Sequence, residues 1–487
     1  MLAEQTFRLF IDGEWVEPAG GHYDVVNPAT EEVVGRAPEA SRAQVYEACA
    51  AAKAAFPAWA RTKPEERAEI LHRVADVIAK HADDYAPLAQ AETGATSATV
   101  KALQVNVAVA RFRRYAKGAL ESVEIPLPPQ VMEATPLSKG GLVGALVVRQ
   151  PVGVVTCITS YNNPWANPAG KIAPALAMGN TLVVKPAPQN PLSVYRMAEA
   201  LEEAGLPRGV VNVVSGASIE VGEATVDSPD VDMVSFTGST SVGRSIGAVA
   251  GGQMKRVLME LGGKGAAIVC ADADVAAAVS AIGTTFSFYA GQICTAPTRV
   301  YAHRDVYDQV VQGLAAYAKA LKVGDPTERD TVVGPVISAA HRDRIEGYVA
   351  SGREQGAELV AGGERPELER GFFVAPTLFA GCSNEMRIVK EEIFGPVVSV
   401  VPVDGDDEAI TLANDSDYGL INYVWSKDAG RAYRIARQLR SGSVDINTVA
   451  QQMEAPFGGF KQSGVGRDRG SFGLHAYSEL QSIVWPS

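Results

Sequence analysis

The stretch that decides the fold lies between residues 153 and 236, where short apolar runs alternate with longer segments. The runs read GVVTCI at 153–158, TLVVK at 181–185, VVNVV at 210–214 and VDMVSF at 231–236. A helical pattern from Pro191 to Ala204 separates two of them. Apolar strands that alternate with helices predict a parallel sheet covered by helices on both faces.

A second series of the same kind begins at Gly265. Strands are predicted at 266–270, 299–303, near 372–374, 397–401 and 421–425, and helices at 274–287, 306–322, 339–356 and 429–439. The sequence therefore predicts the α/β class, with two doubly wound domains that meet near residues 261–263.

The segments outside these series have other patterns. Short strands are predicted at 7–11 and 14–16, and helices at 41–55, 64–82 and 96–120, of which the first has Ser41 as its N-cap. Residues 122–149 contain four prolines and end in a predicted strand at 142–148. This pattern suits a small protruding hairpin.

Composition narrows the class of protein. The 487 residues carry a net charge of −12, which disfavours nucleic acid and anionic membranes as partners. The longest uncharged stretch, 275–298, is broken by glycine and polar residues, so a buried helix is expected rather than a membrane span. The N-terminus shows no signal peptide pattern.

Cysteine and histidine usage adds two expectations. The five cysteines are odd in number and include no Cys-x-x-Cys pair, which favours a reducing compartment such as the cytoplasm. The six histidines do not cluster, so no metal site is expected.

Cys294 and Glu260 are the main candidates for chemistry. Taken alone, each has a plain interpretation: Cys294 as an inert core cysteine, and Glu260 as a solvated carboxylate. However, Cys294 lies where a helix gives way to a strand, between Gly291 and Pro297, and Glu260 ends an apolar run before Gly262. A thiol and a carboxylate could serve as nucleophile and base in a two-step reaction at a carbonyl.

Three other sites follow predicted strands. The glycine-bearing turn 238–244 could present N–H groups to a phosphate, although Arg244 stands where a P-loop has lysine. Lys185 ends a strand at the edge where ligands bind such sheets. The amide of Asn162 could donate to an oxyanion. Each could equally be a turn or surface residue.

Taken together, the motifs resemble the aldehyde dehydrogenase superfamily over nearly the whole chain. The resemblance is carried by FIDGEW at 10–15, NPAT at 27–30, IAPALAMGNT at 172–181, FTGST at 236–240, ELGGK at 260–264, GQIC at 291–294, EEIFGP at 391–396 and PFGGFKQSG at 456–464.

The resemblance assigns roles to matching positions. It implies that Cys294 is the nucleophile, that Asn162 and the Cys294 backbone N–H form an oxyanion hole, and that Glu260 activates water to release the acid. A free thiol is only a few per cent ionised at neutral pH, so we expect cationic or dipolar surroundings to lower the pKa of Cys294.

The same resemblance implies a nicotinamide cofactor. Lys185 matches a residue at the adenosine ribose, Ser239 one at the pyrophosphate, and Glu392 and Phe394 residues at the nicotinamide end. The full predicted set is Ile158, Lys185, Pro188, Gly238, Ser239, Glu260, Leu261, Gly262, Glu392 and Phe394. Pro188 replaces the family's frequent glutamate, which repels a 2′-phosphate. NAD is favoured, but the residue that would exclude NADP is missing.

The substrate tunnel is expected to involve Asn163, Ile293, Thr295 and Gln451. The family is often aromatic near Asn163 and just before Pro456, whereas this chain carries Asn163, Gln451 and Gln452. That departure favours either a more polar aldehyde or a tunnel that is lined by other residues.

The resemblance also implies a domain plan. Residues 1–121 and 151–261 would bind the cofactor, and residues 262–467 would form the catalytic domain, whose tail returns to the first. Residues 122–150 and 468–487 would be oligomerisation elements, giving a homodimer or homotetramer.

Three alternatives remain. An enzyme that forms an acyl-CoA generally lacks the carboxylate at Glu260. A P-loop nucleotide-binding protein is opposed by Arg244. A catalytically silent member is opposed by the intact set of Asn162, Glu260 and Cys294.

Overall fold

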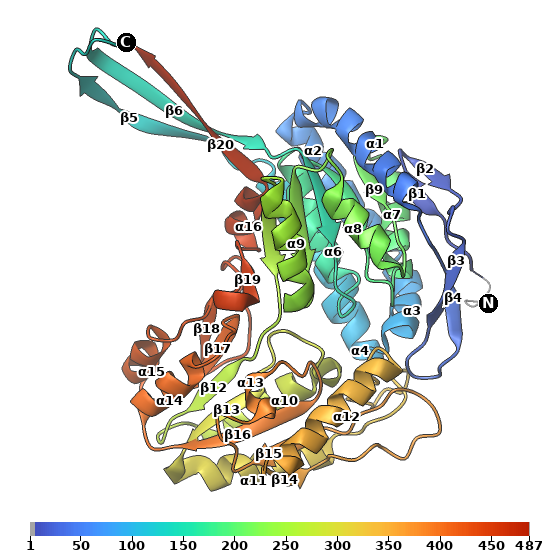
Figure 1. Cartoon of the computed structure of the whole chain (residues 1–487), viewed down its shortest axis with the longest axis vertical. Helices are drawn as coiled ribbons and strands as arrows, with labels where there is room; N and C mark the ends of the chain where they lie inside the picture. The colour runs from blue at the N-terminus through green and yellow to red at the C-terminus, as the bar shows by residue number, and fades with distance from the viewer. Residues whose placement is uncertain (1–4, 487) are drawn as a thin grey trace.

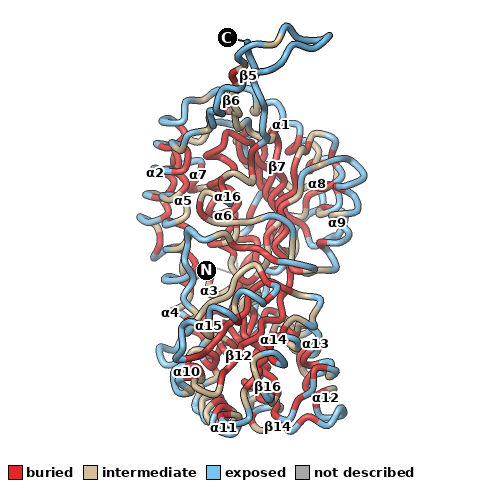
Figure 2. The backbone as a smooth tube through the Cα atoms, turned by 90° about the vertical axis from the view of Figure 1, so that its left-hand side faces the viewer, coloured by how far each residue is buried: buried red, intermediate tan, exposed pale blue. Residues whose placement is uncertain are grey.

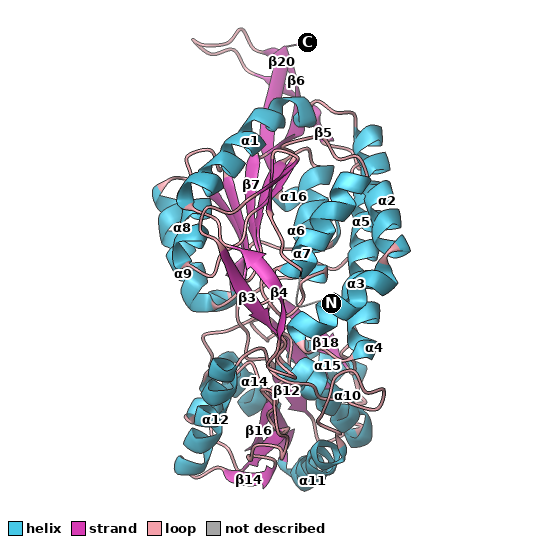
Figure 3. Cartoon of the chain, turned by 90° about the vertical axis from the view of Figure 1, so that its right-hand side faces the viewer, coloured by secondary structure: helices cyan, strands magenta, loops and turns pink. Residues whose placement is uncertain are grey.

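The computed structural model describes residues 5–486, so the N-terminal segment 1–4 lies outside the described residues. The described chain forms two stacked α/β units, and a three-stranded sheet projects from the first of them (Figure 1). In both units helices cover the two faces of a sheet (Figure 3). No helix within residues 5–486 is long and apolar enough to cross a membrane.

The first unit is built on an eight-stranded sheet in the order β19-β11-β10-β7-β8-β9-β1-β2. Its strands are β1 (Leu9–Ile11), β2 (Glu14–Val16), β7 (Val154–Ile158), β8 (Thr181–Lys185), β9 (Val211–Val213), β10 (Met233–Thr237), β11 (Arg256–Glu260) and β19 (Gly464–Val465). The five central strands are parallel. The strand order reverses between β7 and β10, where the carboxyl ends of such strands leave a crevice for a ligand.

Two helical layers bury this sheet. One layer is α1 (Arg42–Ala60), α8 (Ile219–Asp227) and α9 (Thr240–Gly252); the other includes α2 (Pro64–Lys80), α3 (Ala82–Thr93), α5 (Asn106–Gly118), α6 (Ala166–Ala177) and α7 (Leu192–Glu203). Successive strand residues point to opposite layers: Val154 packs with α1 and Val155 with α6. The two-stranded sheet of β3 (His22–Val26) and β4 (Val33–Pro38) lies beside them.

Local signals explain several helix boundaries. Ser41 caps α1 in a capping box with Gln44, as the sequence predicts for Ser41. The predicted helix at 96–120 is interrupted: α4 (Ser97–Thr99) and a π-helical turn (Val100–Val105) precede α5. Helix α3 was not predicted, because Pro87 and a weak apolar pattern conceal it.

The second unit has a seven-stranded sheet in the order β14-β15-β16-β13-β12-β17-β18. Its strands are β12 (Ala266–Val269), β13 (Arg299–His303), β14 (Glu358–Ala361), β15 (Thr377–Ala380), β16 (Val397–Val403), β17 (Ile421–Trp425) and β18 (Ser443–Ile446). Helices α10 (Val275–Ser287) and α11 (Arg304–Ala320) pack on one face. The other face carries α12 (Ala339–Glu354), α13 (Arg387–Lys390), α14 (Asp406–Asn414) and α15 (Ala429–Ala436). The prediction of two doubly wound α/β domains is thus confirmed.

The predicted strand near residues 372–374 is wrong. Phe372 instead bridges two loops, since its N–H donates to the carbonyl of Pro28 and its carbonyl accepts from the N–H of Val336. One hydrogen bond on each side anchors the segment without starting a ladder, and the strand begins only at Thr377.

The projecting sheet has the order β20-β6-β5 and consists of β5 (Glu124–Met132), β6 (Gly141–Pro151) and β20 (Ser478–Pro486). Every residue of β5 is exposed, in contrast to the buried sheets of the two units (Figure 2). Its register with β6 shifts between Leu127 and Gln130, where Pro128 and Pro129 lack the N–H that a ladder needs. Helix α16 (Gly470–Ala476) packs on α5 and α6, so within 468–486 the projecting sheet takes only β20.

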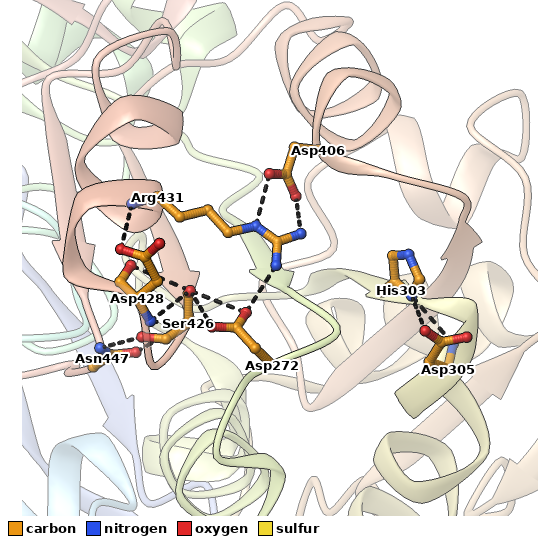
Figure 4. Close-up of polar contacts among 8 residues, drawn as sticks. All are labelled: Asp272, His303, Asp305, Asp406, Ser426, Asp428, Arg431 and Asn447. Atoms are coloured by element: carbon orange, nitrogen blue, oxygen red, sulfur yellow. Dashed lines mark hydrogen bonds and ion pairs between the residues drawn. The ribbon is translucent and has the colours of Figure 1, made fainter.

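An ion-pair network closes the carboxyl edge of the second sheet (Figure 4). Arg431 donates to Asp406 at 2.6 and 2.7 Å and to Asp272 at 2.9 Å, and Ser426 donates to Asp272 at 2.8 Å. Asp272 and Ser426 follow β12 and β17. These contacts therefore occupy the part of the carboxyl edge that follows β12, β16 and β17, an edge where many open α/β sheets bind ligands.

Candidate active site

One cavity of about 1260 Å³ lies between the two units. The carboxyl ends of β7, β8, β10 and β11 reach it from the first unit, and the segment before β13 reaches it from the second. The structure brings all the sequence-predicted site residues to its wall: Ile158, Asn162, Asn163, Lys185, Pro188, Gly238, Ser239, Glu260, Leu261, Gly262, Ile293, Cys294, Thr295, Glu392, Phe394 and Gln451.

Cys294 follows a tight left-handed turn at the end of α10. Tyr289, Ala290 and Gly291 have φ values of 50°, 52° and 72°. A Cβ at Gly291 would lie 2.3 Å from the carbonyl of Gly395, so the position requires glycine for space as well as for its φ. The turn sets the half-buried thiol against the cavity.

The electrostatics of Cys294 differ from the expectation. Burial, together with the nearby carboxyl groups of Glu260 and Glu392, raises the pKa of the Cys294 thiol to about 12, and Arg469 opposes this shift only in part. The expected lowering of the thiol pKa by the protein alone is therefore wrong. In the protein without ligands the nucleophile is a neutral thiol at pH 7, mainly because the thiol is buried.

Glu260 ends β11 and is only 5% exposed. Neither carboxyl oxygen has a hydrogen-bond partner among the described residues. Burial, followed by the charge of Asp468, raises the pKa of Glu260 well above its usual range, while Lys171 and Arg469 oppose that shift. A buried carboxyl group with free oxygens can take a proton from a reactant near neutral pH.

Asn162 is held from both ends of its amide. Its Nδ2 donates to the carbonyl of Gln292 at 2.8 Å, and its Oδ1 accepts from Ser160 at 2.8 Å. The first bond joins the β7 side of the cavity to the turn that carries Cys294. An amide has two N–H donors, and the second has no partner among residues 5–486.

The cofactor residues predicted from the sequence lie along the first unit's side of the cavity. Ser239 is the N-cap of α9 and accepts from the N–H of Val242. Burial lowers the pKa of Lys185 to about 8. Glu392 accepts from the N–H of Gly263 at 2.8 Å, and a Cβ at Gly262 would lie 2.3 Å from the Glu392 carboxylate.

Phe394 has a φ of 59° and makes an edge contact with Tyr161. This ring pair joins the loop of Phe394, from the second unit, to the loop that follows β7.

Residues 238–245 do not form a P-loop. They make an ordinary capped helix start, and Arg244 turns away from the cavity to donate to Gln462.

The sequence reasoning missed several residues that line the cavity or act on Glu260 through their charge. Lys171 is buried in α6, and its Nζ donates to Ser235 at 3.0 Å. It is the single charged residue of an apolar helix, and this pattern in the sequence could have marked it as a candidate. Arg111, Asp468 and Arg469, unlike Lys171, line the cavity itself. The last two were assigned to an oligomerisation segment, although the glycine-flanked charges at 466–470 could have suggested a site.

Metal-binding and disulfide chemistry find no support in the described chain. Within residues 5–486 no group of three His, Cys, Asp or Glu side chains could hold a metal ion. All five cysteines are free.

Comparison with known proteins identifies the family. The sequence model of the Aldehyde dehydrogenase family matches residues 15–483. The betaine aldehyde dehydrogenase of Bacillus subtilis is 39% identical over 486 residues, covering 98% of this chain and 96% of that protein. The geranial dehydrogenase of Castellaniella defragrans is 41% identical over 479 residues, covering 98% of each. The structure of betaine aldehyde dehydrogenase from Staphylococcus aureus in complex with NAD+ has a TM-score of 0.93 and 38% identity, covering 98% of this chain and 94% of that chain. The chain belongs to the aldehyde dehydrogenase family.

Proposed function

We propose that the protein oxidises an aldehyde to the carboxylic acid with NAD+, through covalent catalysis by Cys294 and hydrolysis assisted by Glu260. One observation carries the assignment of these roles: the thiol of Cys294, the unpartnered carboxyl of Glu260 and the half-satisfied amide of Asn162 line one cavity. A nucleophile, a base and an oxyanion donor are the groups that acyl transfer needs.

The chemistry follows from these groups. Cys294 Sγ bonds to the aldehyde carbon while the thiol proton is released to water, which leaves the oxygen of the thiohemiacetal as an oxyanion. The free N–H of Asn162 and the backbone N–H of Cys294 stabilise the oxyanion, a donor being worth roughly 3 kcal/mol in comparable sites. After loss of hydride the adduct is a thioester. Glu260 takes a proton from water, which attacks the thioester carbon, and the acid leaves as the thiol is restored.

The first unit's side of the cavity fits a dinucleotide. The N–H groups at the start of α9 suit a pyrophosphate, and the partly neutral amine of Lys185 and the fixed carboxylate of Glu392 suit ribose hydroxyls. When bound, NAD+ supplies the hydride acceptor. The positive charge of its nicotinamide ring would also lower the pKa of Cys294 and so favour the thiolate, whereas the surrounding protein raises that pKa.

The cavity near Pro188 favours NAD over NADP. Glu223 and Asp227 also line this end of the cavity, and their charges would repel a 2′-phosphate. Arg42, which also lines the cavity, already pairs with Glu220 and Asp227. We expect a higher kcat/KM with NAD; a higher value with NADP would contradict this assignment.

Two variants test the catalytic roles. Cys294→Ala is expected to abolish NADH formation, and full turnover in this variant would refute the mechanism. Glu260→Gln is expected to retain a single-turnover burst of NADH and to lose steady-state acid release. Addition of CoA tests the acyl-CoA alternative, which predicts a CoA thioester as the product and no dependence on Glu260.

We also propose that residues 1–121 and 151–261 bind the cofactor, that residues 262–467 form the catalytic domain, and that the projecting sheet joins subunits. Exposed apolar side chains on that sheet support the last point: Ile125, Leu127, Val131, Leu142, Ile483, Val484 and Trp485. A homodimer or homotetramer should appear by light scattering, and deletion of β20 should reduce it to monomers. Free cysteines support a cytoplasmic location, which cell fractionation tests.

A further inference from the structure

Two guanidinium groups that line the cavity have no ion-pair partner within residues 5–486. Arg469 and Arg111 both contribute to the wall. Arg469 Nη2 donates to Gln451 Oε1 at 2.6 Å, and Arg111 Nη1 donates to the carbonyl of Ala166 at 2.6 Å. Neither forms an ion pair with a carboxylate of the described chain.

The side chain of Arg469 is held in place, but not all of its N–H donors have hydrogen-bond acceptors among residues 5–486. It lies at the start of α16 with a φ of 69°, and its guanidinium carbon lies 4.0 Å from the centre of the Phe457 ring. Its Nε is buried and has no hydrogen-bond partner among residues 5–486. A guanidinium has five N–H donors, and a buried donor without an acceptor costs free energy until an acceptor arrives.

The charge of Arg469 acts close to the reacting groups. It opposes the upward pKa shifts of both Cys294 and Glu260, so its field reaches the thiol and the base. Burial, and after it repulsion from the charge of Arg111, lowers the pKa of Arg469, and both side chains line the same cavity. An anion placed between them would relieve this repulsion.

The neighbouring wall is polar. Asn163, Asn167 and Gln451 line the cavity with Arg469 and Arg111. The amides of Asn163 and Gln451 can donate to the oxygens of an anion, whereas Asn167 Nδ2 already donates to Ser160. Asp468 also lines the cavity and its charge acts on Arg469, but within residues 5–486 no carboxylate forms an ion pair with either arginine. A guanidinium fork is also the side chain that best matches the geometry of a carboxylate.

We propose that Arg469, with Arg111 as a second cation, binds a carboxylate at the far end of the substrate, so that the enzyme acts on aldehydes that carry a carboxylate group. This inference rests on the aldehyde oxidation proposed above and adds the substrate class. The products are then dicarboxylates.

The same contacts oppose a cationic aldehyde such as betaine aldehyde. A quaternary ammonium group is commonly bound against aromatic faces. In this cavity the face of Phe457 is already covered by the guanidinium of Arg469, whose charge repels a second cation. The relatives named above therefore do not determine the substrate of this chain.

Matched substrates test the proposal. We would measure kcat/KM for ω-oxo acids of three to six carbons, for unbranched neutral aldehydes of the same lengths, and for betaine aldehyde. The wild-type enzyme is expected to prefer an oxo acid. Loss of one partner of a buried ion pair predicts that Arg469→Leu lowers kcat/KM for the oxo acid by roughly 30- to 1,000-fold, mainly through KM. The ratio of kcat/KM for the oxo acid to kcat/KM for the neutral aldehyde of the same length should fall as well.

Two variants and one inhibition measurement complete the design. Arg469→Lys keeps the positive charge but loses the paired N–H donors of the guanidinium. Its ratio of kcat/KM for oxo acid to neutral aldehyde should therefore lie between those of the wild type and Arg469→Leu. Arg113→Leu is the matched control, because Arg113 lies on α5 near Arg111 but is exposed and pairs with Asp76; its ratio should equal that of the wild type. In the wild type, a dicarboxylate should inhibit more strongly than a monocarboxylate of equal length, a comparison that needs no variant.

The proposal is overturned if the wild type oxidises neutral aldehydes or betaine aldehyde better than every oxo acid, or if Arg469→Leu lowers kcat/KM equally for both classes. Either result leaves Cys294-dependent oxidation intact. Failure of the proposed function looks different, since no aldehyde would then be oxidised at all.

Discussion

Replacement of Gly291 by alanine is the most direct test of how the nucleophile is positioned. Gly291 has a φ of 72° and ends the left-handed turn before Cys294. Its added Cβ would lie 2.3 Å from the carbonyl of Gly395. Both partners are backbone, so no flexible side chain can move aside. Either the Cys294 turn or the chain at Phe394 must shift.

The expected magnitude has two parts. A left-handed conformation costs a residue with a Cβ about 1–2 kcal/mol. Overpacking adds about 1–3 kcal/mol. The free energy of unfolding should therefore fall by about 2–5 kcal/mol. A displacement of the thiol by about 1 Å should also lower kcat by about 100-fold.

Gly356→Ala separates the two parts. Gly356 has a φ of 85°, and nothing lies within 4 Å of its hypothetical Cβ. It should show the conformational cost alone, with normal kcat. Steady-state NADH formation and denaturant unfolding followed by tryptophan fluorescence would be measured for both variants. A kcat for Gly291→Ala equal to that of Gly356→Ala would refute the idea that close packing at this turn positions Cys294.

Three further predictions follow from single contacts. Asn162→Ala should lower kcat by about 100- to 1,000-fold with little change in KM; a pure KM effect in steady-state assays would argue against an oxyanion role. Ser41→Ala removes the α1 capping box and should destabilise the protein by about 1 kcal/mol without altering kcat, and unchanged denaturant unfolding would contradict it. Lys264 is buried with an unpartnered amine, and burial lowers its pKa from 10.5 to about 7. Between these pH values the unfolded lysine binds a proton that the folded one has lost, so its contribution makes stability rise with pH. Lys264→Met should remove this part of the slope, and an unchanged slope in denaturation at pH 7 to 10 would contradict the assignment.

The parts of the fold that were predicted well are those with strong local patterns. The strands at 181–185, 299–303 and 421–425 agree with β8, β13 and β17 because each is a continuous run buried on both faces. The run near residues 372–374 is as apolar as a strand, but its partners are two loops that no local pattern reveals. Hydrogen bonds to distant loops, rather than the strand propensity of its residues, determined the conformation of that segment.

The site shows the same division. Cys294, Glu260 and Asn162 lie in recognisable motifs, and the structure brings them to one cavity. The motifs could not predict the pKa of Cys294, because it depends on the burial and the charges that the fold creates around the thiol. Arg469 was missed because its importance comes from spatial contact with Phe457 and Gln451, to which no pattern in the sequence links it.

The contact between Asn162 and Gln292 has a consequence for how the chain matures. The cavity is complete only when segments around residues 162, 292 and 469 have come together. During synthesis the first unit can bury its sheet early, except for β19, but the reactive thiol has neither its full set of neighbours nor Arg469 until the segment around residue 469 has been synthesised. Catalytic competence is thereby delayed until that segment has joined the cavity, so a chain that stops before it lacks part of the site.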